Sequence, residues 1–326
     1  MNIPMPAPLP ALQDMRCGLI ALVGLPNAGK STLMNALVGE KIGIISNKPN
    51  TTRVTVRGVV TEGVNQMVFM DTPGLNRSSK AFDRRLVQQA TGAAVEADIL
   101  VLLCEVESGK GKNITGGLTT EMRQMAEEGK KRGQKVVILL TKIDKLKDKA
   151  QLLPTLTELN EWNADVIIPI AAIKATEGSS GKGSGVDRVI AELTKLLPEG
   201  MWLFPPEQTT DIPLPLRLAE LTREQAMRQL HQEIPYNIGV ITEGTDETVD
   251  PENGEPITIV NQQILVAKEQ HKPMVLGKSG QMLQKIGTFS RLEMQKILGT
   301  RVRLELHVKV AERWLEREQW LREMGV

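Results

Sequence analysis

The segment from Gly24 to Ser31, with the sequence GLPNAGKS, restricts the fold of this chain more than any other feature. It follows a short apolar run at residues 19–23 and precedes TLMNALVG, a stretch suited to a helix. The glycines of this loop allow backbone N–H groups to converge at the start of that helix. A strand, a tight loop and a helix are therefore expected in this order, within an α/β domain.

Further apolar runs alternate with helical stretches up to residue 197. They lie at residues 67–70, 99–104, 136–140 and 166–170, and short continuous apolar runs of this kind are typical of buried parallel strands. We therefore expect a doubly wound, mostly parallel sheet. Five prolines between residues 198 and 215 mark its end, because no continuous helix tolerates that density.

A second, smaller α+β module is expected beyond these prolines. The pattern predicts a long helix at 214–233, strands at 237–242 and 257–267, helical segments across 273–298 and a strictly alternating strand at 301–310. Trp314, Leu315 and Leu321 fit a final amphipathic helix docked onto that sheet. The expected organisation is a flexible tail at 1–15, a first domain at 16–197, a linker at 198–213 and a second domain at 214–326.

Charge is polarised within the second module although the whole chain carries a formal net charge of only +1. Residues 242–256 contain six acids and no Lys or Arg, which suggests a solvated hairpin loop. Residues 268–310 contain nine Lys or Arg against three acids. A nucleic acid partner would therefore have to be held by a local basic surface.

The two cysteines, the N-terminal sequence and the length of the apolar runs favour a cytoplasmic protein. Cys17 and Cys104 both lie in apolar runs without metal-ligand spacing, as expected for reduced core residues. The proline-rich N-terminus resembles neither a secretory signal nor a transit peptide. No apolar run reaches the roughly 20 residues of a membrane-spanning helix, so any membrane association is expected to be peripheral, on the inner face of the cell membrane.

Chemistry at GLPNAGKS points to a nucleoside triphosphate. The backbone around Gly24 and Gly29 can surround phosphate oxygens, Lys30 can reach the β and γ phosphates, and the Ser31 hydroxyl can ligate magnesium. The loop alone does not identify the base. That information comes from TKID at residues 141–144, where the Asp144 carboxylate can accept hydrogen bonds from N1 and N2 of guanine.

Two further segments lie where a γ-phosphate would be sensed. In DTPG, at residues 71–74, Asp71 is expected to hold magnesium through water and the Gly74 amide to contact the γ-phosphate. Thr51 and Thr52 follow the first helix, and we favour Thr52 as the ligand of both metal and γ-phosphate. Loops held only by a γ-phosphate become mobile when it is lost, which is the basis of a switch.

The order GLPNAGKS, NTTR, DTPG and TKID resembles the Ras-like GTPase superfamily, and PN in the first loop, the paired threonines before Arg53 and DTPGL resemble its Era branch, the TrmE-Era family. With EIPY at 233–236 the resemblance extends from about residue 16 to the C-terminus. It implies a P-loop G domain that binds GTP or GDP with Mg²⁺. The nucleotide-binding set then expected is Gly24, Asn27, Ala28, Gly29, Lys30, Ser31, Thr32, Asp71, Gly74, Thr141, Lys142, Asp144 and Ala172.

The resemblance also implies how hydrolysis proceeds. Leu75 occupies the position of the water-orienting glutamine of Ras-type enzymes and cannot orient water by hydrogen bonding, so intrinsic hydrolysis should be slow. Asn27 matches the asparagine with which related GTPases hold K⁺ against the phosphates, where the ion can supply the charge of an arginine finger. Lys30, Thr52, Gly74 and Asn27 are the expected catalytic group.

Two positions depart from the family pattern. Thr141 replaces the usual asparagine, which shortens the side chain that braces the base pocket. Ala171, Ala172 and Ile173 replace the usual Ser-Ala-Lys, a change that the site can tolerate because the amide of Ala172, rather than a side chain, is the expected contact to guanine.

The C-terminal module resembles the type II KH domain of this family, with VLGKSG at 275–280 followed by Leu283 and Ile286. A G-x-x-G turn entering a helix lets a nucleic acid backbone approach closely. The resemblance implies the 3′ end of 16S rRNA as ligand. The expected RNA-binding residues are Lys272, Met274, Gly277, Lys278, Ser279, Gly280, Lys285 and Ile286, with core packing as the equal alternative for Met274 and Ile286.

Together with these features, the resemblance implies a GTPase that binds the 3′ end of 16S rRNA and acts in assembly of the 30S ribosomal subunit. Two alternatives stay open. Leu75, Thr141 and Ala171 would also suit a nucleotide-sensing module with little turnover, and the basic C-terminal face would also suit docking to a protein or a membrane surface.

Overall fold

The computed structural model describes residues 11–46, 48, 51–75, 81–106, 119–176, 184–251 and 254–325. Most of the predicted N-terminal tail, residues 1–10, lies outside this part of the chain. The chain divides into two compact units: Met1–Gly43, Thr55–Arg77 and Val87–Asp211 form the first, and Ile44–Val54, Ser78–Leu86 and Ile212–Val326 form the second. The two inserted segments of the second unit were not expected.

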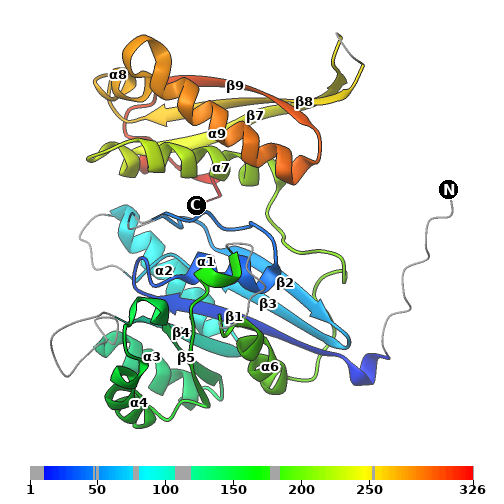
Figure 1. The fold of residues 1–326 in the computed structure, drawn as a ribbon, viewed down its shortest axis with the longest axis vertical. Coiled ribbons are helices and arrows are strands. Elements are labelled where there is room, and N and C mark those ends of the chain that lie inside the picture. The colour runs from blue at the N-terminus through cyan, green and yellow to red at the C-terminus, as the bar shows by residue number, and fades with distance from the viewer. Residues whose placement is uncertain are drawn as a thin grey trace. The chain divides into compact units, whose positions relative to one another are not determined.

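The first unit is built on a six-stranded sheet in the order β2-β3-β1-β4-β5-β6 (Figure 1). All neighbouring pairs are parallel except β2 with β3. The five expected strands are therefore confirmed, and the antiparallel edge strand β2 is an addition. The strands are β1 (Arg16–Gly24), β2 (Val56–Glu62), β3 (Asn65–Asp71), β4 (Ile99–Glu105), β5 (Lys135–Thr141) and β6 (Val166–Pro169).

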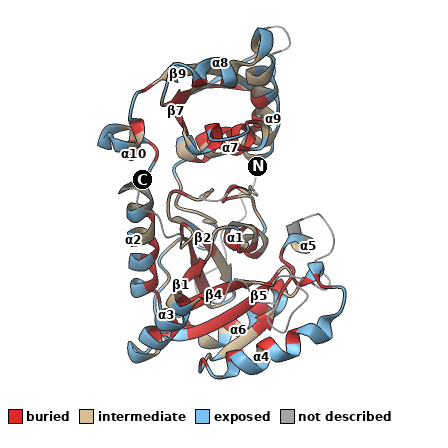
Figure 2. Ribbon diagram, turned by 90° about the vertical axis from the view of Figure 1, so that its left-hand side faces the viewer, coloured by how far each residue is buried: buried red, intermediate tan, exposed pale blue. Residues whose placement is uncertain are grey.

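Helices cover both faces of this sheet, which leaves β1, β4 and β5 almost entirely buried (Figure 2). Apolar side chains of α2, α3 and α4 pack on the face that carries Ala21, Leu102 and Ile138. Burial on both faces explains why these strands have continuous apolar sequences. The helices are α1 (Lys30–Val38), α2 (Ala81–Glu96), α3 (Thr120–Lys131), α4 (Leu152–Asn160), α5 (Ile173–Thr176) and α6 (Val186–Leu196).

The proline-rich stretch expected to be a linker is instead bound along the first unit. The Cys17 amide donates to the Pro198 carbonyl at 3.2 Å, and the Val59 amide donates to the Thr209 carbonyl at 2.8 Å. The buried Gln66 side chain accepts hydrogen bonds from the amides of Leu203 and Phe204. The prolines prevent a helix in this stretch, but its backbone N–H and C=O groups form hydrogen bonds with residues of the first sheet.

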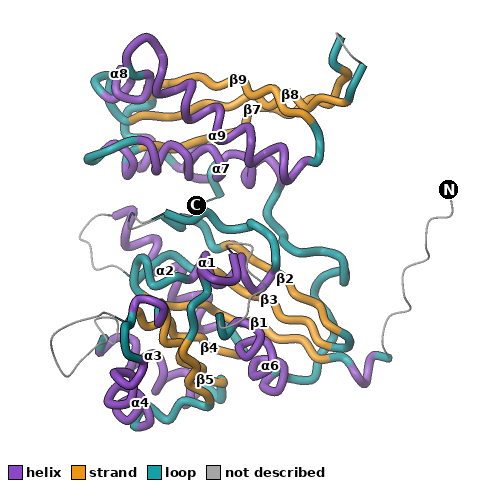
Figure 3. Tube along the Cα trace, in the orientation of Figure 1, coloured by secondary structure: helices purple, strands orange, loops and turns teal. Residues whose placement is uncertain are grey.

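The second unit contains a three-stranded sheet, in the order β7-β8-β9, with helices packed on one face (Figure 3). β8 is antiparallel to β7 and parallel to β9. Ile264, Val266 and Val275 are among the residues of a core that α7, α8 and α9 share with the sheet. The elements are α7 (Leu214–Gln229), β7 (Ile238–Val249), β8 (Pro256–Val266), α8 (His271–Leu276), α9 (Gln281–Leu298), β9 (Arg301–Val310) and α10 (Glu318–Glu323).

The acidic segment differs from the expected hairpin loop, because strand pairing continues almost to its end. Thr245 pairs with Val260 and Val249 pairs with Pro256, after a register shift at Thr242 and Gly244. Repeated threonines in this segment favour extended backbone despite the charges between them. Arg301 forms an ion pair with Asp250 at 2.8 Å, so part of the acidic segment is neutralised by the basic one.

The C-terminal residues close the open face of the second sheet, as the sequence predicted. Trp314 is fully buried and packs with Ile241, Leu265 and Leu321. Its indole Nε1 donates a hydrogen bond to the carbonyl of Asn237 at 3.2 Å. The large ring therefore combines apolar burial with a satisfied polar group.

We expect Trp314→Ala to lower the free energy of unfolding by about 3–5 kcal/mol, because it removes a fully buried ring and leaves a cavity. Urea denaturation followed by circular dichroism measures the change. Val249→Thr is the matched control on an exposed strand position, with an expected effect within about 0.5 kcal/mol. A Trp314→Ala protein as stable as the wild type would contradict this account of the core.

Candidate functional site

The predicted phosphate, metal and base residues of the first unit follow the carboxyl ends of parallel strands. GLPNAGKS follows β1, DTPG follows β3, TKID closes β5, and Ala171 and Ala172 come after β6. Because parallel strands end at one edge of a sheet, these segments are brought together there. β1 lies between β3 on one side and β4 on the other, so the chain continues from β1 toward both sides of the sheet. The loop after β1 therefore lies where the strand order reverses, which is the position at which open α/β sheets bind ligands.

The loop between β1 and α1 is shaped by its own backbone. Asn27 and Gly29 both have positive φ, 65° and 97°, and α1 begins at the next residue, Lys30. Asn27 is an exposed residue of this turn. The amides at the start of α1 are therefore directed toward the loop, an arrangement that binds phosphate oxygens.

Lys30 is buried, and its ammonium group is held by the loop itself. The Nζ atom donates to the carbonyls of Gly24 and Leu25 at 3.1 and 3.0 Å. Burial lowers the pKa of Lys30 to about 8, although the Asp71 carboxylate acts in the opposite direction. An anionic phosphate brought to this loop would stabilise the charged form of Lys30.

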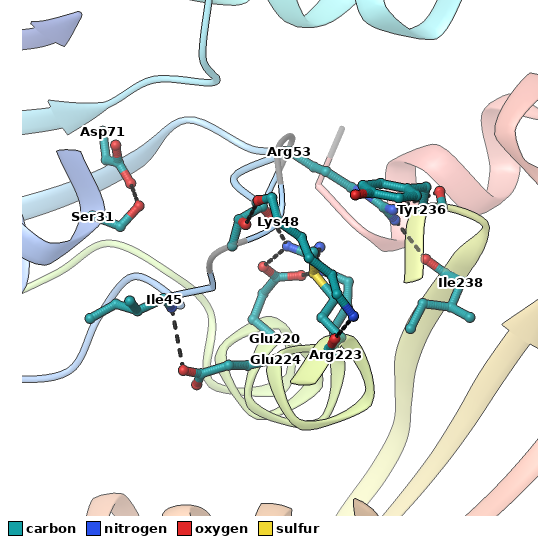
Figure 4. A network of polar contacts seen from close by, with 12 residues as sticks. Ser31, Ile45, Lys48, Arg53, Asp71, Glu220, Arg223, Glu224, Tyr236 and Ile238 are labelled. Carbon is teal, nitrogen blue, oxygen red and sulfur yellow. Dashed lines mark hydrogen bonds and ion pairs between the residues drawn. The ribbon is translucent and has the colours of Figure 1, made fainter. Parts of the chain in front are cut away.

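Ser31 and Asp71, the two residues of the first unit that are expected to hold magnesium, contact each other. The Ser31 hydroxyl donates to Oδ2 of Asp71 at 2.6 Å (Figure 4). Asp71 is fully buried at the end of β3. A hydroxyl and a carboxylate oxygen form the hard donor set that Mg²⁺ prefers, with phosphate and water completing the shell. The residues present therefore fit this ion.

DTPG packs directly against the phosphate loop. The Leu75 amide donates to the Gly24 carbonyl at 3.1 Å, and the Thr72 hydroxyl donates to the Leu22 carbonyl at 2.8 Å. A Cβ atom at Gly74 would come within 2.8 Å of the Pro26 nitrogen, so only glycine fits there. The Leu75 side chain packs against the core of the first unit.

Thr141 contacts the phosphate loop despite its short side chain. Its hydroxyl donates to the Ala28 carbonyl at 2.8 Å, and the residue is buried. The base-recognition segment is thereby tied to the phosphate loop. A threonine reaches this carbonyl because β5 and the loop are already adjacent at the sheet edge.

Asp144 and Lys142 are presented by the short turn that follows β5. Lys142 has a positive φ of 61°, and Asp144 lies in the 3₁₀ turn Ile143–Lys145 with its carboxylate exposed. Ala172 is buried at the start of α5, and the Ala171 amide donates to the Ser184 carbonyl at 2.8 Å. An exposed carboxylate and a backbone amide are the two kinds of group expected to bind a guanine base.

Sequence reasoning missed Glu105, which orders this turn. Its carboxylate forms ion pairs with Lys142 at 2.6 Å and with Lys145 at 2.9 Å. Burial acts to raise the pKa of Glu105, but the hydrogen bonds and charges of the two lysines outweigh it and lower the pKa. The sequence signal that could have identified Glu105 is its position directly after the apolar run 99–104, where a buried strand ends.

Thr52 belongs to the second compact unit, whereas Ser31 and Asp71 belong to the first. The three predicted metal ligands are therefore divided between the units. Thr52 as a metal ligand stays a prediction, and so does Asn27 as a potassium ligand.

In the second unit, the G-x-x-G turn has the backbone geometry that its glycines suggested. Gly277 and Gly280 have φ of 70° and 79°, and a Cβ atom at Gly277 would lie 2.6 Å from that of Met282. Lys278 and Ser279 are exposed at the tip, immediately before α9. An uncovered turn at a helix start can be approached closely by a phosphate backbone.

The other predicted RNA contacts divide by exposure. Lys272, Lys285 and Met274 are exposed around the turn, with Met274 at 48%. Ile286 is fully buried in the core shared by α7, α8 and α9. The structure therefore favours the core-packing alternative for Ile286 and leaves Met274 accessible.

Within the part of the chain that the structure describes, no helix has the length and apolar content needed to span a bilayer.

Known families match both parts of the chain. Residues 19–142 match the 50S ribosome-binding GTPase family, and residues 233–315 match the KH domain family. The chain is 39% identical to GTPase Era of Dinoroseobacter shibae over 311 residues, with 95% of each chain covered. It is 36% identical to GTPase Era of Desulfovibrio desulfuricans, with 95% of this chain and 97% of the relative covered.

Solved structures agree with these matches. An Era variant from Aquifex aeolicus bound to GDP and AlF₄⁻ has a TM-score of 0.82 and 34% identity, covering 95% of this chain and 99% of that one. Era in complex with MgGDPNP and nucleotides 1506–1542 of 16S ribosomal RNA has the same TM-score, identity and coverage. The loop that holds Lys30, the brace from Thr141 and the G-x-x-G turn thus occur in a chain that belongs to the Era family of GTPases, with a GTPase domain and a KH domain.

Proposed function

We propose that this protein is a GTP-hydrolysing switch that binds the 3′ end of 16S rRNA and acts in the cytoplasm in assembly of the 30S ribosomal subunit. The observation that carries the proposal is the hydrogen bond from Thr141 to Ala28, which ties a guanine-reading segment to the phosphate loop. The exposed G-x-x-G turn supports the RNA-binding part. The similar Era structure in complex with MgGDPNP and 16S rRNA nucleotides supports the choice of GTP, Mg²⁺ and 16S rRNA as ligands.

The nucleotide site assigns a separate task to each group. Lys30 and the amides at the start of α1 bind the phosphates, while the Asp144 carboxylate and the Ala172 amide select guanine. Ser31 and Thr52 would hold magnesium directly, and Asp71 would hold it through water. The ion would neutralise charge that develops on the phosphates during transfer.

Slow intrinsic hydrolysis is part of the proposal because Leu75 has no polar group. Its side chain packs against the core of the first unit and its amide is bonded to Gly24, so it offers nothing to orient an attacking water. Asn27, an exposed residue of the phosphate loop, is the residue we assign to a K⁺ ion. The ion would lower the barrier by electrostatic stabilisation.

RNA binding is assigned to the tip of the G-x-x-G turn and the lysines around it. Lys278 with Lys272 and Lys285 would contact phosphates, and Met274 would line the groove for unstacked bases. The structure gives no support to an RNA contact by the buried Ile286 side chain. A nucleotide-sensing module with little turnover remains the second candidate, and Leu75 is the observation that favours it.

Thr141→Ala is expected to weaken GTP and GDP binding about 5- to 30-fold, because one buried hydrogen bond worth about 1–2 kcal/mol is lost and the Ala28 carbonyl is left unpaired. Calorimetric titration of the nucleotide-free protein measures both affinities. Thr141→Ser keeps the hydroxyl and should stay within about twofold of the wild type. Equal affinities for the wild type and the alanine variant would show that this bond does not brace the site.

Phosphate release from GTP tests the catalytic part of the proposal. We expect a rate about tenfold higher in potassium than in sodium buffer, equivalent to about 1.4 kcal/mol of transition-state stabilisation, and no release from ATP. Asn27→Ala should remove the difference between the two ions while GDP affinity persists. Equal rates in both buffers would disprove the potassium role, and no release in either would favour the nucleotide-sensing alternative.

A double substitution, Lys278→Asp with Ser279→Asp, should reduce affinity for a 16S rRNA 3′-end oligonucleotide at least about 100-fold, since attraction to phosphate becomes repulsion. Gln295→Asp with Lys296→Asp is the matched control: it changes the net charge equally, but at the other end of α9. Fluorescence anisotropy measures both. A comparable loss for the two double variants would indicate non-specific charge attraction, as expected for a surface that docks membranes.

A further inference from the structure

Glu105 lies at the end of β4, directly beside the segment TKID that is expected to read guanine. β4 and β5 are parallel neighbours, and Glu105 is paired in register with Thr141 (Figure 1). The amide of the next residue, Val106, donates a hydrogen bond to the Thr141 carbonyl at 3.1 Å. The main chain that carries Glu105 is therefore fixed against the start of TKID by the pairing of the two strands.

The turn that follows β5 presents two lysines on one side. The Lys145 amide donates a hydrogen bond to the Lys142 carbonyl at 3.0 Å, which closes the 3₁₀ turn. Side chains three residues apart eclipse one another in such a turn, so Lys142 and Lys145 share one side of it. Asp144 lies between them in the sequence and therefore belongs to a different side of the turn.

The carboxylate of Glu105 binds both lysines, one with each oxygen. Its Oε2 atom lies 2.6 Å from Nζ of Lys142, and its Oε1 atom lies 2.9 Å from Nζ of Lys145. The side chain of Glu105 is only 24% exposed, so these charges are screened by water less than those of a surface ion pair. A single group on the neighbouring strand thus holds the first and the last residue of the turn and opposes its rotation.

Asp144 is the member of this turn that the protein leaves available. Ile143 and Leu146 are buried in the core of the first unit, and the Ile143 amide donates to the Ile170 carbonyl at 3.3 Å. Asp144 is exposed, and no residue that the structure describes forms an ion pair with its carboxylate. Because Glu105 occupies the ammonium groups of the two lysines, neither of them neutralises the carboxylate between them.

We propose that Glu105 is a positioning residue for guanine selectivity: by binding Lys142 and Lys145 it orients the turn so that the Asp144 carboxylate meets the base. This inference rests on the proposed function, in which Asp144 accepts hydrogen bonds from N1 and N2 of guanine. Hydrogen bonds weaken steeply when they are misaligned. A small rotation of the turn therefore reduces selectivity for the base, whereas phosphate binding depends on Lys30 and on the amides of a different loop.

A comparison of two nucleotides distinguishes positioning from general stabilisation of the fold. Inosine diphosphate (IDP) has the phosphates, the ribose and the N1 donor of GDP, but it lacks the N2 amine. The ratio of the Kd for IDP to the Kd for GDP therefore reports the contact between Asp144 and N2. If Glu105 only stabilised the two strands, its loss would weaken both nucleotides equally and leave this ratio unchanged.

The test measures both Kd values for the full chain by calorimetric titration. The wild type should bind GDP at least about tenfold more tightly than IDP, because IDP forgoes one hydrogen bond to a charged acceptor. Glu105→Gln keeps the size of the side chain but replaces one acceptor oxygen by a donor, so the ratio should fall below about threefold. In Asp144→Ala the ratio should be close to one, and adding Glu105→Gln should not change it, because Glu105 acts through Asp144.

Two further variants separate this role from folding. Lys145→Met removes only the more exposed ion pair, so it should fold normally and still lower the ratio at least about twofold. Glu192→Gln is the matched control, since Glu192 is 25% exposed and pairs with Lys195 at 2.9 Å on α6; it should keep the wild-type ratio.

A wild-type ratio in either Glu105→Gln or Lys145→Met, or equal losses of GDP and IDP affinity, would overturn the inference. A wild-type protein that binds ADP as tightly as GDP would instead refute the guanine-reading part of the proposed function.

Discussion

The carbonyl oxygen of Gly24 joins the parts of the nucleotide site in the first unit. It accepts one hydrogen bond from Lys30 and another from the Leu75 amide. The same loop is held from the opposite side through Ala28 by Thr141. Main-chain carbonyls of a single turn thus accept the hydrogen bonds that connect the phosphate loop to DTPG and to TKID. Thr141, at a position where the family pattern has an asparagine, makes its contact to this turn with a hydroxyl.

Much of the first unit followed from the sequence because its strands are buried on both faces. Continuous apolar runs predicted all five parallel strands, and the motifs lay where those strands end. The edge strand β2 was missed because Gly58 interrupts a mixed sequence, and glycine ordinarily weakens a strand. Here a Cβ atom at that position would lie 2.8 Å from the side chain of Val38. Only the packing of α1 on the sheet, which local sequence does not encode, reveals why glycine is required.

The attachment of Ile44–Val54 to the KH domain could not be predicted for a related reason. The motif NTTR suggested a loop that responds to phosphate, and Thr52 was selected by its chemistry. Its neighbours bind distant main-chain carbonyls: Arg53 contacts residues 236 and 238, and Lys48 contacts residues 227 and 230. Main-chain acceptors are present at every residue and leave no signal in sequence. The chemistry of a site was therefore easier to predict than the surroundings that position it.

The acidic hairpin at residues 242–256 also bears on self-association of the protein. β7 is an edge strand of the three-stranded sheet, and its outer half extends to Val249. An exposed edge of this length presents unpaired backbone groups to any other extended chain, which is a route to aggregation. Glu243, Asp246 and Glu247 place like charges along β7. A second copy approaching in the same manner would bring the same charges, so the residues that seemed only to solvate a loop protect the free edge of the sheet from self-association.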